Sequence, residues 1–275
     1  MPPVKCWQVD AFTNRPFGGN PAAVCWLESA ADPQWMQSIA AEMNLSETAF
    51  VRRLEDGHEL RWFTPTVEVD LCGHATLATA HVLWSAGLVI PSQPLRFHTR
   101  SGVLTCAQDG ELIELDFPAT PPTEIPIPTG FAAALGAVPI YVGKSRFDYV
   151  AILDSAETVR RLKPDFRQLE QFPVRGVIIS ALADTPEFDF VSRFFAPRVG
   201  VDEDPVCGSA HCCLTPYWAE QLGKSPLMAH QVSARGGVLR LKLNHDRVIL
   251  GGQAVTVWKG ELTTNGSCQP VANGG

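Results

Sequence analysis

The sequence predicts a chain of the α+β class, built as two similar, pseudo-symmetric domains that arose by internal duplication. Each domain is expected to be a curved, mainly antiparallel sheet packed on one principal helix. Two observations support this prediction. Separated parts of the 275-residue chain repeat in the same order, and most of the rest consists of short apolar segments separated by turn residues. The length also favours two domains over one.

The repeat is clearest in two ten-residue windows, 61–70 (RWFTPTVEVD) and 193–202 (RFFAPRVGVD), which are identical at six positions. Each window runs into a Cys-Gly pair, at Cys72 and Cys207, an offset of 135 residues. The same offset aligns Arg100, Gly102, Val103 and Leu104 with Arg235, Gly237, Val238 and Leu239. The Cys-Gly pairs and these four residues share one register, which together with the similar windows indicates duplication.

A helix is predicted after each Cys-Gly pair. The two segments start at Ala75 and Ala210 and end at Gly87 and Gly223, where a left-handed C-cap residue is expected. Each half therefore has the order strand, Cys-Gly turn, helix and hairpin. Two further helices are predicted, near 33–43 and 156–171.

The predicted strands are short, rich in Val, Phe, Trp and Leu, and separated by turns such as Asp56-Gly57 and Asp109-Gly110. Those of the first half are 4–12, 21–27, 48–54, 58–64, 95–107 and 111–117. Those of the second half are 140–153, 176–182, 188–195, 237–243, 247–252 and 254–262.

The domain boundary is predicted at a proline-rich segment. Five prolines between 118 and 128 suit an extended linker and disfavour a central strand or helix. We expect an N-terminal domain at 1–118 and a C-terminal domain at 119–262. The tail at 263–275 has loop composition and is expected to fray.

Composition and charge disfavour several classes of partner. The chain has 29 acidic and 22 basic residues, a net charge of -7, so no nucleic-acid partner is expected. No apolar run is long enough to span a bilayer, and the N-terminus lacks the apolar region of a signal peptide. We therefore expect a cytoplasmic protein without a membrane partner. Its eight thinly spread cysteines are expected to be free thiols.

The two Cys-Gly turns are candidate chemical sites. A helix that starts after each turn would direct unpaired N–H groups and its positive dipole end at the turn. Two such turns facing one cleft would bind a carboxylate. The same field would lower the pKa of Cys72 and Cys207, and two thiols on opposite faces of a Cα suit racemisation without a cofactor. The alternative is that both cysteines only pack as small apolar side chains.

Other polar residues lie in the same turns. His74 follows the first Cys-Gly pair, and Glu203, Asp204 and Ser209 surround the second. These groups could pass protons at neutral pH. The alternative for His74 is a histidine at a helix start whose ring is satisfied by hydrogen bonds.

Glu47 is a third candidate, because it follows the turn formers Asn44 and Ser46 and precedes an apolar strand. It would then lie at a strand end facing the cleft, and the alternative is a solvated loop charge. Asn20, after a Gly-Gly turn, is a candidate hydrogen-bonding amide. That turn has neither Walker spacing nor the GxGxxG pattern, so no nucleotide site is expected. Although Cys207 and His211 are four residues apart, no second paired cluster has zinc-site spacing, and no metal is expected.

Four motifs, in order and over almost the whole chain, resemble the PhzF family of phenazine-biosynthesis-like isomerases. They are DAFT with FGGNPAAV, NLSETAF, DLCGHATLA and EDPVCGSAH. The resemblance implies the diaminopimelate epimerase-like fold, in which two barrels, each wrapped around a central helix, flank the active site. It implies a cofactor-independent isomerase that moves a proton on a small carboxylate-bearing substrate and forms a homodimer.

The resemblance also implies residue roles. Glu47 would be the general acid/base. The substrate would be bound and polarised by Gly73, His74, Asp204, Gly208 and Ser209.

Cys72 and Cys207 leave a second activity open, because they look like the two catalytic cysteines of diaminopimelate epimerase and proline racemase. Against a two-thiol racemase, His74 replaces the Asn of the epimerase signature Cys-Gly-Asn-Gly, and the second turn follows the PhzF pattern. The isomerase is therefore favoured. A non-catalytic binding or interaction protein on the same scaffold is the other alternative, because function depends on the site and not on the fold.

Overall fold

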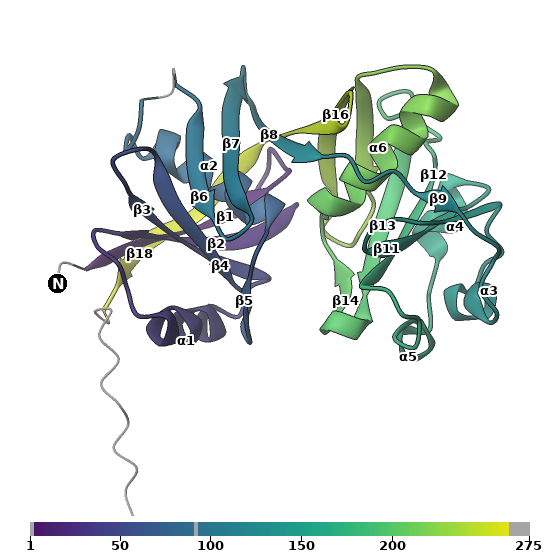
Figure 1. Ribbon diagram of the computed structural model, residues 1–275, viewed down its shortest axis with the longest axis horizontal. Helices are drawn as coiled ribbons and strands as arrows, with labels where there is room; N and C mark the ends of the chain where they lie inside the picture. The colour runs from purple at the N-terminus through teal and green to yellow at the C-terminus, as the bar shows by residue number, and fades with distance from the viewer. Residues whose placement is uncertain (1–2, 91–92, 264–275) are drawn as a thin grey trace, which may run out of the picture. The chain divides into compact units, whose positions relative to one another are not determined.

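The structure is a computed structural model that describes residues 3–90 and 93–263 (Figure 1). The chain divides into two compact units. The first consists of Met1–Pro16, Pro21–Ile113 and Ala254–Gly275, and the second of Phe17–Asn20 and Glu114–Gln253.

The strands of the first unit are β1 (Val4–Ala11), β2 (Asn20–Leu27), β3 (Glu47–Arg53), β4 (His58–Phe63), β5 (Glu68–Val69), β6 (Leu95–Thr99), β7 (Gly102–Asp109) and β18 (Ala254–Leu262). Its helices are α1 (Pro33–Met43) and α2 (Gly73–Ser85).

Strand β8 (Leu112–Pro118) leads into the second unit, whose other strands are β9 (Thr123–Glu124), β10 (Tyr141–Lys144), β11 (Asp148–Ile152), β12 (Gly176–Leu182), β13 (Phe190–Ala196), β14 (Val201–Asp204), β15 (Leu227–Gln231), β16 (Gly237–Asn244) and β17 (Arg247–Gly252). Its helices are α3 (Phe131–Leu135), α4 (Ala156–Arg161), α5 (Phe166–Leu169), the short η1 (Pro197–Val199) and α6 (Gly208–Leu222).

The C-terminal strand corrects the predicted division of the chain. Strand β18 pairs antiparallel with β1 along its whole length, from Val4 opposite Leu262 to Ala11 opposite Ala254. Residues 254–262 therefore complete the first unit instead of ending the second. This long-range pairing leaves no local signal in either segment. The boundary between the units lies within β8, a few residues before the prolines that predicted it. Residues 264–275, which make up most of the predicted tail and include Cys268, lie outside the described part.

The strand pairings confirm the internal duplication. In the first unit β2–β3 is parallel, β3–β4 and β4–β5 are antiparallel, β4–β6 is parallel and β6–β7 is antiparallel. In the second unit β11–β12 is parallel, β12–β13 and β13–β14 are antiparallel, β13–β15 is parallel and β15–β16 is antiparallel. The two units thus repeat five pairings in the same order and sense.

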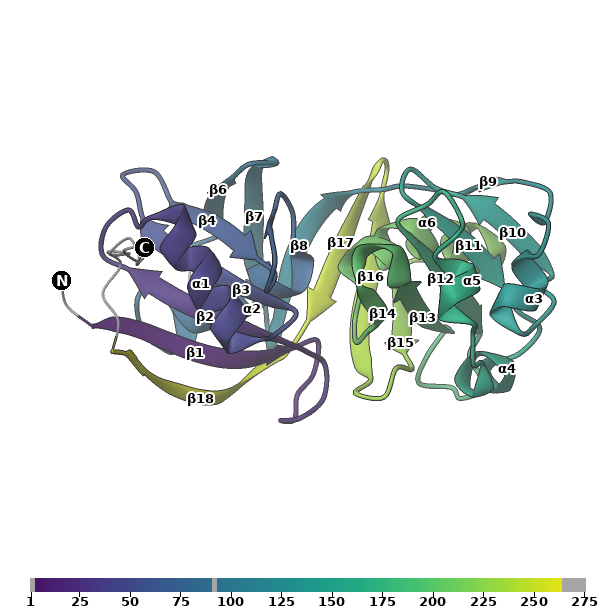
Figure 2. The same cartoon turned by 90° about the horizontal axis from the view of Figure 1, so that it is seen from below.

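Each unit has one helix whose side chains are buried on nearly every face, α2 in the first and α6 in the second. A helix that is apolar or buried all round lies inside a core and not on its surface. Figure 2 shows α2 among the strands of its unit. Both helices begin at the residue after a cysteine N-cap, Cys72 or Cys207, and α6 ends at a left-handed Gly223, as predicted.

Other local predictions were partly right. The helix at 33–43 is α1. The single helix predicted at 156–171 is instead two short helices, α4 and α5, because Pro164 between them has no N–H and disfavours a continuous helix. Strand β15 and helix α3 were not predicted. None of the described helices is both long and apolar enough to cross a bilayer.

Candidate active site

The first unit brings together three of the predicted site residues. Glu47 is the first residue of β3, and its backbone lies opposite Ala22 of the parallel strand β2. Cys72 is the N-cap of α2, and His74 lies in the first turn of that helix. The His74 Nε2 atom is 3.1 Å from Glu47 Oε2. On the other side of the ring, His74 Nδ1 is 3.5 Å from Cys72 Sγ.

The imidazole of His74 therefore bridges a carboxylate and a thiol. Its side chain is 7% exposed and that of Glu47 is 19% exposed. Burial by itself lowers the pKa of His74, but the charges and hydrogen bonds of Cys72 and Glu47 oppose burial and raise it well above its ordinary value. An imidazolium between a carboxylate and a sulfur fits these distances, with its Nδ1–H available to the Cys72 sulfur. Glu47 Oε2 and His74 Nε2 form no hydrogen bond of good angle within the described residues.

The thiol pKa values differ from the expectation. Burial and the nearby charge of Glu47 raise the pKa of Cys72 to about 11, although His74 opposes this. Burial and Asp204 raise the pKa of Cys207 above its ordinary value as well. The lowering of the thiol pKa that is expected at a helix start is outweighed, because both thiols are buried and each has the charge of a carboxylate nearby. Burial therefore favours the thiol form of both cysteines.

The same three residues have the donor types of a metal site. One ligand atom from each of Glu47, Cys72 and His74 lies within 4.8 Å of the other two. However, the carboxylate faces Nε2 of the histidine and the thiol faces Nδ1, on opposite sides of the ring. One ion binds a single imidazole nitrogen, so the arrangement suits a proton path through the ring better than a metal centre.

The second turn, in the second unit, is held by two buried amides. Asn20 Nδ2 donates to Asp204 Oδ1 at 2.6 Å and to the Val206 carbonyl at 2.9 Å. Gln231 Nε2 donates to the Asp204 carbonyl at 2.6 Å, and Gln231 Oε1 accepts from the Cys207 N–H at 2.9 Å. Asn20, predicted to bind substrate, thus positions the Asp204 carboxylate through Nδ2. Its Oδ1 atom is buried without a hydrogen bond among the described residues.

Cys207 and Ser209 lie beside an arginine that the sequence analysis did not identify. Cys207 Sγ is 3.3 Å from Ser209 Oγ, and Arg175 Nη2 donates to the same oxygen at 2.8 Å. The Arg175 guanidinium also binds the buried carboxylate of Asp148. Arg175 and Gln231 lie at strand ends far from any motif, so no local signal marked them.

The other predicted residues have clear positions. Gly73 and Gly208 are the first residues of α2 and α6, where backbone N–H groups have no partner within the helix. Glu203 is not part of the second cluster, because it forms a two-bond ion pair with Arg193 at 2.8 and 2.9 Å. The first unit repeats this pair as Arg61 with Glu68, at 2.7 and 2.9 Å. Both pairs are therefore part of the duplicated framework.

The two copies differ at the position of Glu47. Glu47 lies opposite Ala22 at the start of the β2–β3 pairing, and Gly176 lies opposite Asp148 at the start of the β11–β12 pairing. Two residues after the helix-capping cysteine, the first copy has His74 and the second has Ser209. A carboxylate at this strand position and an imidazole two residues after the cysteine thus occur in the first copy only. Near its own turn, the second copy has Arg175, Asp148 and Ser209 instead.

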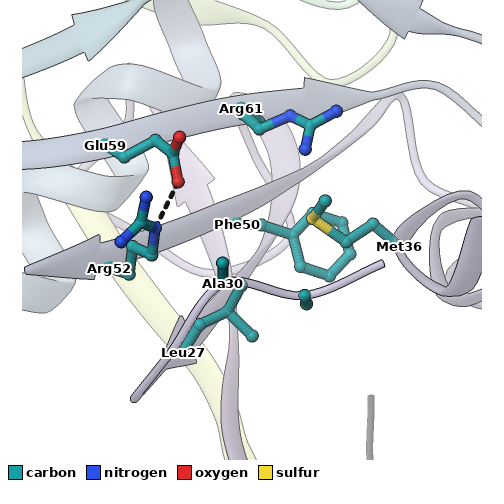
Figure 3. Close-up of a pocket in the computed structure, with 8 residues that line it drawn as sticks. Leu27, Ala30, Met36, Phe50, Arg52, Glu59 and Arg61 are labelled. Atoms are coloured by element: carbon teal, nitrogen blue, oxygen red, sulfur yellow. Dashed lines mark hydrogen bonds and ion pairs between the residues drawn. The ribbon is translucent and has the colours of Figure 1, made fainter. Parts of the chain in front are cut away.

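A small pocket in the first unit does not include the candidate residues (Figure 3). The Arg52–Glu59 ion pair lies at this pocket. The lining residues are Leu27, Ala30, Ala31, Met36, Phe50, Arg52, Glu59 and Arg61. It contains no nucleophile and no histidine, so we do not assign the chemistry to it.

The duplicated α+β units and their helix-capping turns define a protein of the diaminopimelate epimerase-like fold class. A proline racemase-like structure from Agrobacterium radiobacter has the same fold, with a TM-score of 0.64 at 11% identity, covering 95% of this chain and 93% of that one. Residues 9–260 match the family model described as phenazine biosynthesis-like protein, PhzC-PhzF. The chain belongs to this family.

Individual relatives agree with this assignment. A protein of Halalkalibacterium halodurans named as an uncharacterized isomerase is 55% identical over 255 residues, which cover 92% of this chain and 96% of that protein. The crystal structure of a PhzF-family phenazine biosynthesis protein from Enterococcus faecalis superimposes with a TM-score of 0.92 at 44% identity. The match covers 95% of this chain and all of that one.

Proposed function

We propose that this protein is a cofactor-independent isomerase that moves a proton on a small carboxylate-bearing substrate, with Glu47 as the general acid/base. The observation that carries the proposal is the 3.1 Å approach of His74 Nε2 to Glu47 Oε2 in a mostly buried setting. Membership of the PhzF family and the relatives named as isomerases support the reaction class. The homodimer and the cytoplasmic location stay predictions.

The proposed proton path begins with the Glu47 carboxylate, which removes a proton from a carbon next to an electron-withdrawing group. The protonated Glu47, whose proton can exchange with solvent, then delivers a proton to a different carbon of the same substrate, so no other reactant is consumed. The cationic ring of His74 stabilises the carboxylate form of Glu47 before the transfer. Its second N–H, directed at the Cys72 sulfur, holds the ring in place.

The second turn has a binding role in this proposal. The Asp204 carboxylate is held by Asn20, and Gly208 and Ser209 begin helix α6, which has free N–H groups at its start. We assign to Asp204, Gly73, Gly208 and Ser209 the binding and polarisation of the substrate. Asn20 takes part by positioning Asp204.

The two-thiol racemase is less well supported. It requires one of Cys72 and Cys207 to be a thiolate near neutral pH, and burial next to a carboxylate raises the pKa of both. A protein that binds a small molecule without converting it is the remaining alternative.

The proposal is tested by deuterium incorporation from D2O into a panel of amino acids, hydroxy acids and cyclic dienoic acids, followed by mass spectrometry. Isomerase activity predicts exchange at a carbon-bound position of at least one compound, together with a shifted double bond. Exchange at an amino-acid Cα with inversion and no double-bond shift would favour the racemase instead. Binding without exchange of any compound would favour the non-catalytic alternative.

A further inference from the structure

The Arg175 guanidinium links two side chains of the second unit, Asp148 and Ser209. Its Nε donates to Asp148 Oδ1 at 2.9 Å, and Nη2 donates to both Asp148 Oδ2 and Ser209 Oγ, the latter at 2.8 Å. The guanidinium carbon lies over two aromatic rings, 5.3 Å from the centre of Phe147 and 5.2 Å from that of Phe194. The hydrogen bonds and the two rings together restrict the movement of the guanidinium.

The ion pair between Arg175 and Asp148 is mostly buried. The Asp148 side chain is 2% exposed and that of Arg175 is 35% exposed. Burial raises the pKa of Asp148, while the bonds and charge of Arg175 oppose this and favour the ionised carboxylate. The N–H of Asp148 in turn is held by Ser145 Oγ at 3.1 Å. The buried Asp148 therefore holds Arg175 in a position where its Nη2 donates to Ser209.

The hydrogen bonds of Ser209 then follow from donor and acceptor counting. Arginine has no acceptor, so Ser209 Oγ must accept from Arg175. The second neighbour, Cys207 Sγ at 3.3 Å, can either donate to this oxygen or accept from it, and sulfur is only a weak acceptor. The Ser209 hydrogen is therefore available to a stronger acceptor. A hydroxyl held in this way is suited to donate to an anionic oxygen.

We infer that Arg175 is a positioning residue, which fixes the Ser209 hydroxyl so that it donates to a carboxylate oxygen of the substrate. The inference deepens the proposed function and rests on it for the nature of the substrate. Arg175 does not contact the substrate in this account and acts through Ser209.

The test is a double-mutant cycle on the full chain, with equilibrium binding of cyclohexa-1,3-diene-1-carboxylate and of its neutral carboxamide measured by NMR titration. The variants are Arg175→Lys, Ser209→Ala and the two combined. Arg175→Lys keeps a cation beside Asp148, so the buried carboxylate stays neutralised. The Arg160→Lys variant is the control, since Arg160 makes a similar two-bond pair with Asp184 at 2.7 and 2.6 Å without touching Ser209.

We expect the unmodified protein to prefer the carboxylate over the carboxamide by roughly tenfold or more, as for a hydrogen bond to a charged group. Arg175→Lys and Ser209→Ala should each remove most of this preference, and the combined variant should lose no more than Ser209→Ala alone. Arg160→Lys should keep the preference. The ratio of the two affinities does not respond to a general loss of stability, which affects both probes equally.

Two results would overturn the inference. One is an unmodified protein with no preference for the carboxylate. The other is a loss of carboxylate preference on Arg175→Lys that is as large in the Ser209→Ala background as in the unmodified protein. Arg175 would then contact the ligand directly. A second pair of variants, Asp148→Asn with Arg175→Gln, removes both charges together and gives the same answer if Arg175→Lys does not fold.

The outcome is separate from that of the proposed function. The binding preference is measured without turnover, so it does not depend on proton exchange. A protein with this preference but without proton exchange would contradict the proposed isomerase and leave the role of Arg175 supported.

Discussion

Glu47 and Gly176 occupy equivalent places in the two copies of the repeat, each opening the second strand of a parallel pair. At Gly176 an added Cβ would lie 2.6 Å from two ring atoms of Phe194 and 2.7 Å from the Phe195 carbonyl oxygen. The second copy therefore has no room for a side chain where the first has its carboxylate. This asymmetry favours a single carboxylate base over a symmetric pair of catalytic groups.

The closeness of Phe194 predicts the effect of Gly176→Ala. The new methyl group must displace the Phe194 ring or the backbone, and overpacking of this kind costs about 1–3 kcal/mol of unfolding free energy. Urea denaturation measures the change. In a Phe194→Leu background, where the ring is gone, the cost of Gly176→Ala should be smaller. An equal cost in both backgrounds would show that the ring is not the obstacle.

Glu47→Gln removes the proposed base and keeps the shape of the side chain. We expect deuterium exchange on the responsive compound to fall at least about a hundredfold, the usual effect of losing a general base. The variant should stay folded, although it loses the ion pair with the buried His74. The control is Glu42→Gln on the exposed surface of α1, which should leave exchange intact. Near-normal exchange by Glu47→Gln would remove Glu47 from this role.

His74 is expected to be a cation at pH 7.5, because Cys72 and Glu47 raise its pKa well above the ordinary value against the effect of burial. The side-chain 15N shifts in an NMR titration report this charge directly. Since the pKa is higher in the folded state, the stabilisation is complete below about pH 6.5 and is lost as the pH rises through the folded value. Glu47→Gln should lower the pKa of His74. A ring that is neutral at pH 7.5 would contradict the proposed ion pair.

His211 should behave in the opposite way. Its Nδ1–H donates to the Cys207 carbonyl at 2.8 Å, and its Nε2 accepts from Ser192 Oγ at 3.2 Å. Burial lowers the pKa of His211 from 6.5 to about 4, so the unfolded chain binds a proton in this range that the folded protein does not. The unfolding free energy should therefore fall by roughly 3 kcal/mol between pH 7 and pH 4 from this residue alone.

The contribution of His211 is measured as the difference in the pH dependence of stability between the unmodified protein and His211→Asn. The variant is expected to be less stable at pH 7 and to lose less stability on acidification. Parallel curves for the two proteins would show that His211 titrates normally in the folded state.

Cys72→Ser and Cys207→Ser distinguish the two proton-transfer chemistries. In the proposed isomerase neither thiol reacts, so each variant should retain exchange activity within about tenfold of the unmodified protein, as expected for a change that leaves the general base in place. Deuterium exchange under the same conditions measures this. Loss of all exchange in both variants would instead support the two-thiol racemase.

The sequence by itself determined the repeat, most of the strands and both central helices. These features depend on local patterns: apolar runs of strand length, a Cys-Gly pair before each helix, and a glycine where the helix ends. The sequence also identified Glu47, Cys72 and His74 as candidates. Residue spacing alone, however, could not bring Glu47 next to a histidine 27 residues further along the chain.

The tertiary structure decided what depends on contacts between distant segments. It paired the last strand with the first and placed Arg175 beside Ser209. It also brought Gln231, from a strand that was not predicted, into hydrogen-bond contact with the second turn. It also reversed the expected thiol pKa shift at Cys72. A helix start favours a thiolate, but burial beside Glu47 outweighs that effect, and burial is a property of the folded chain and not of any local segment.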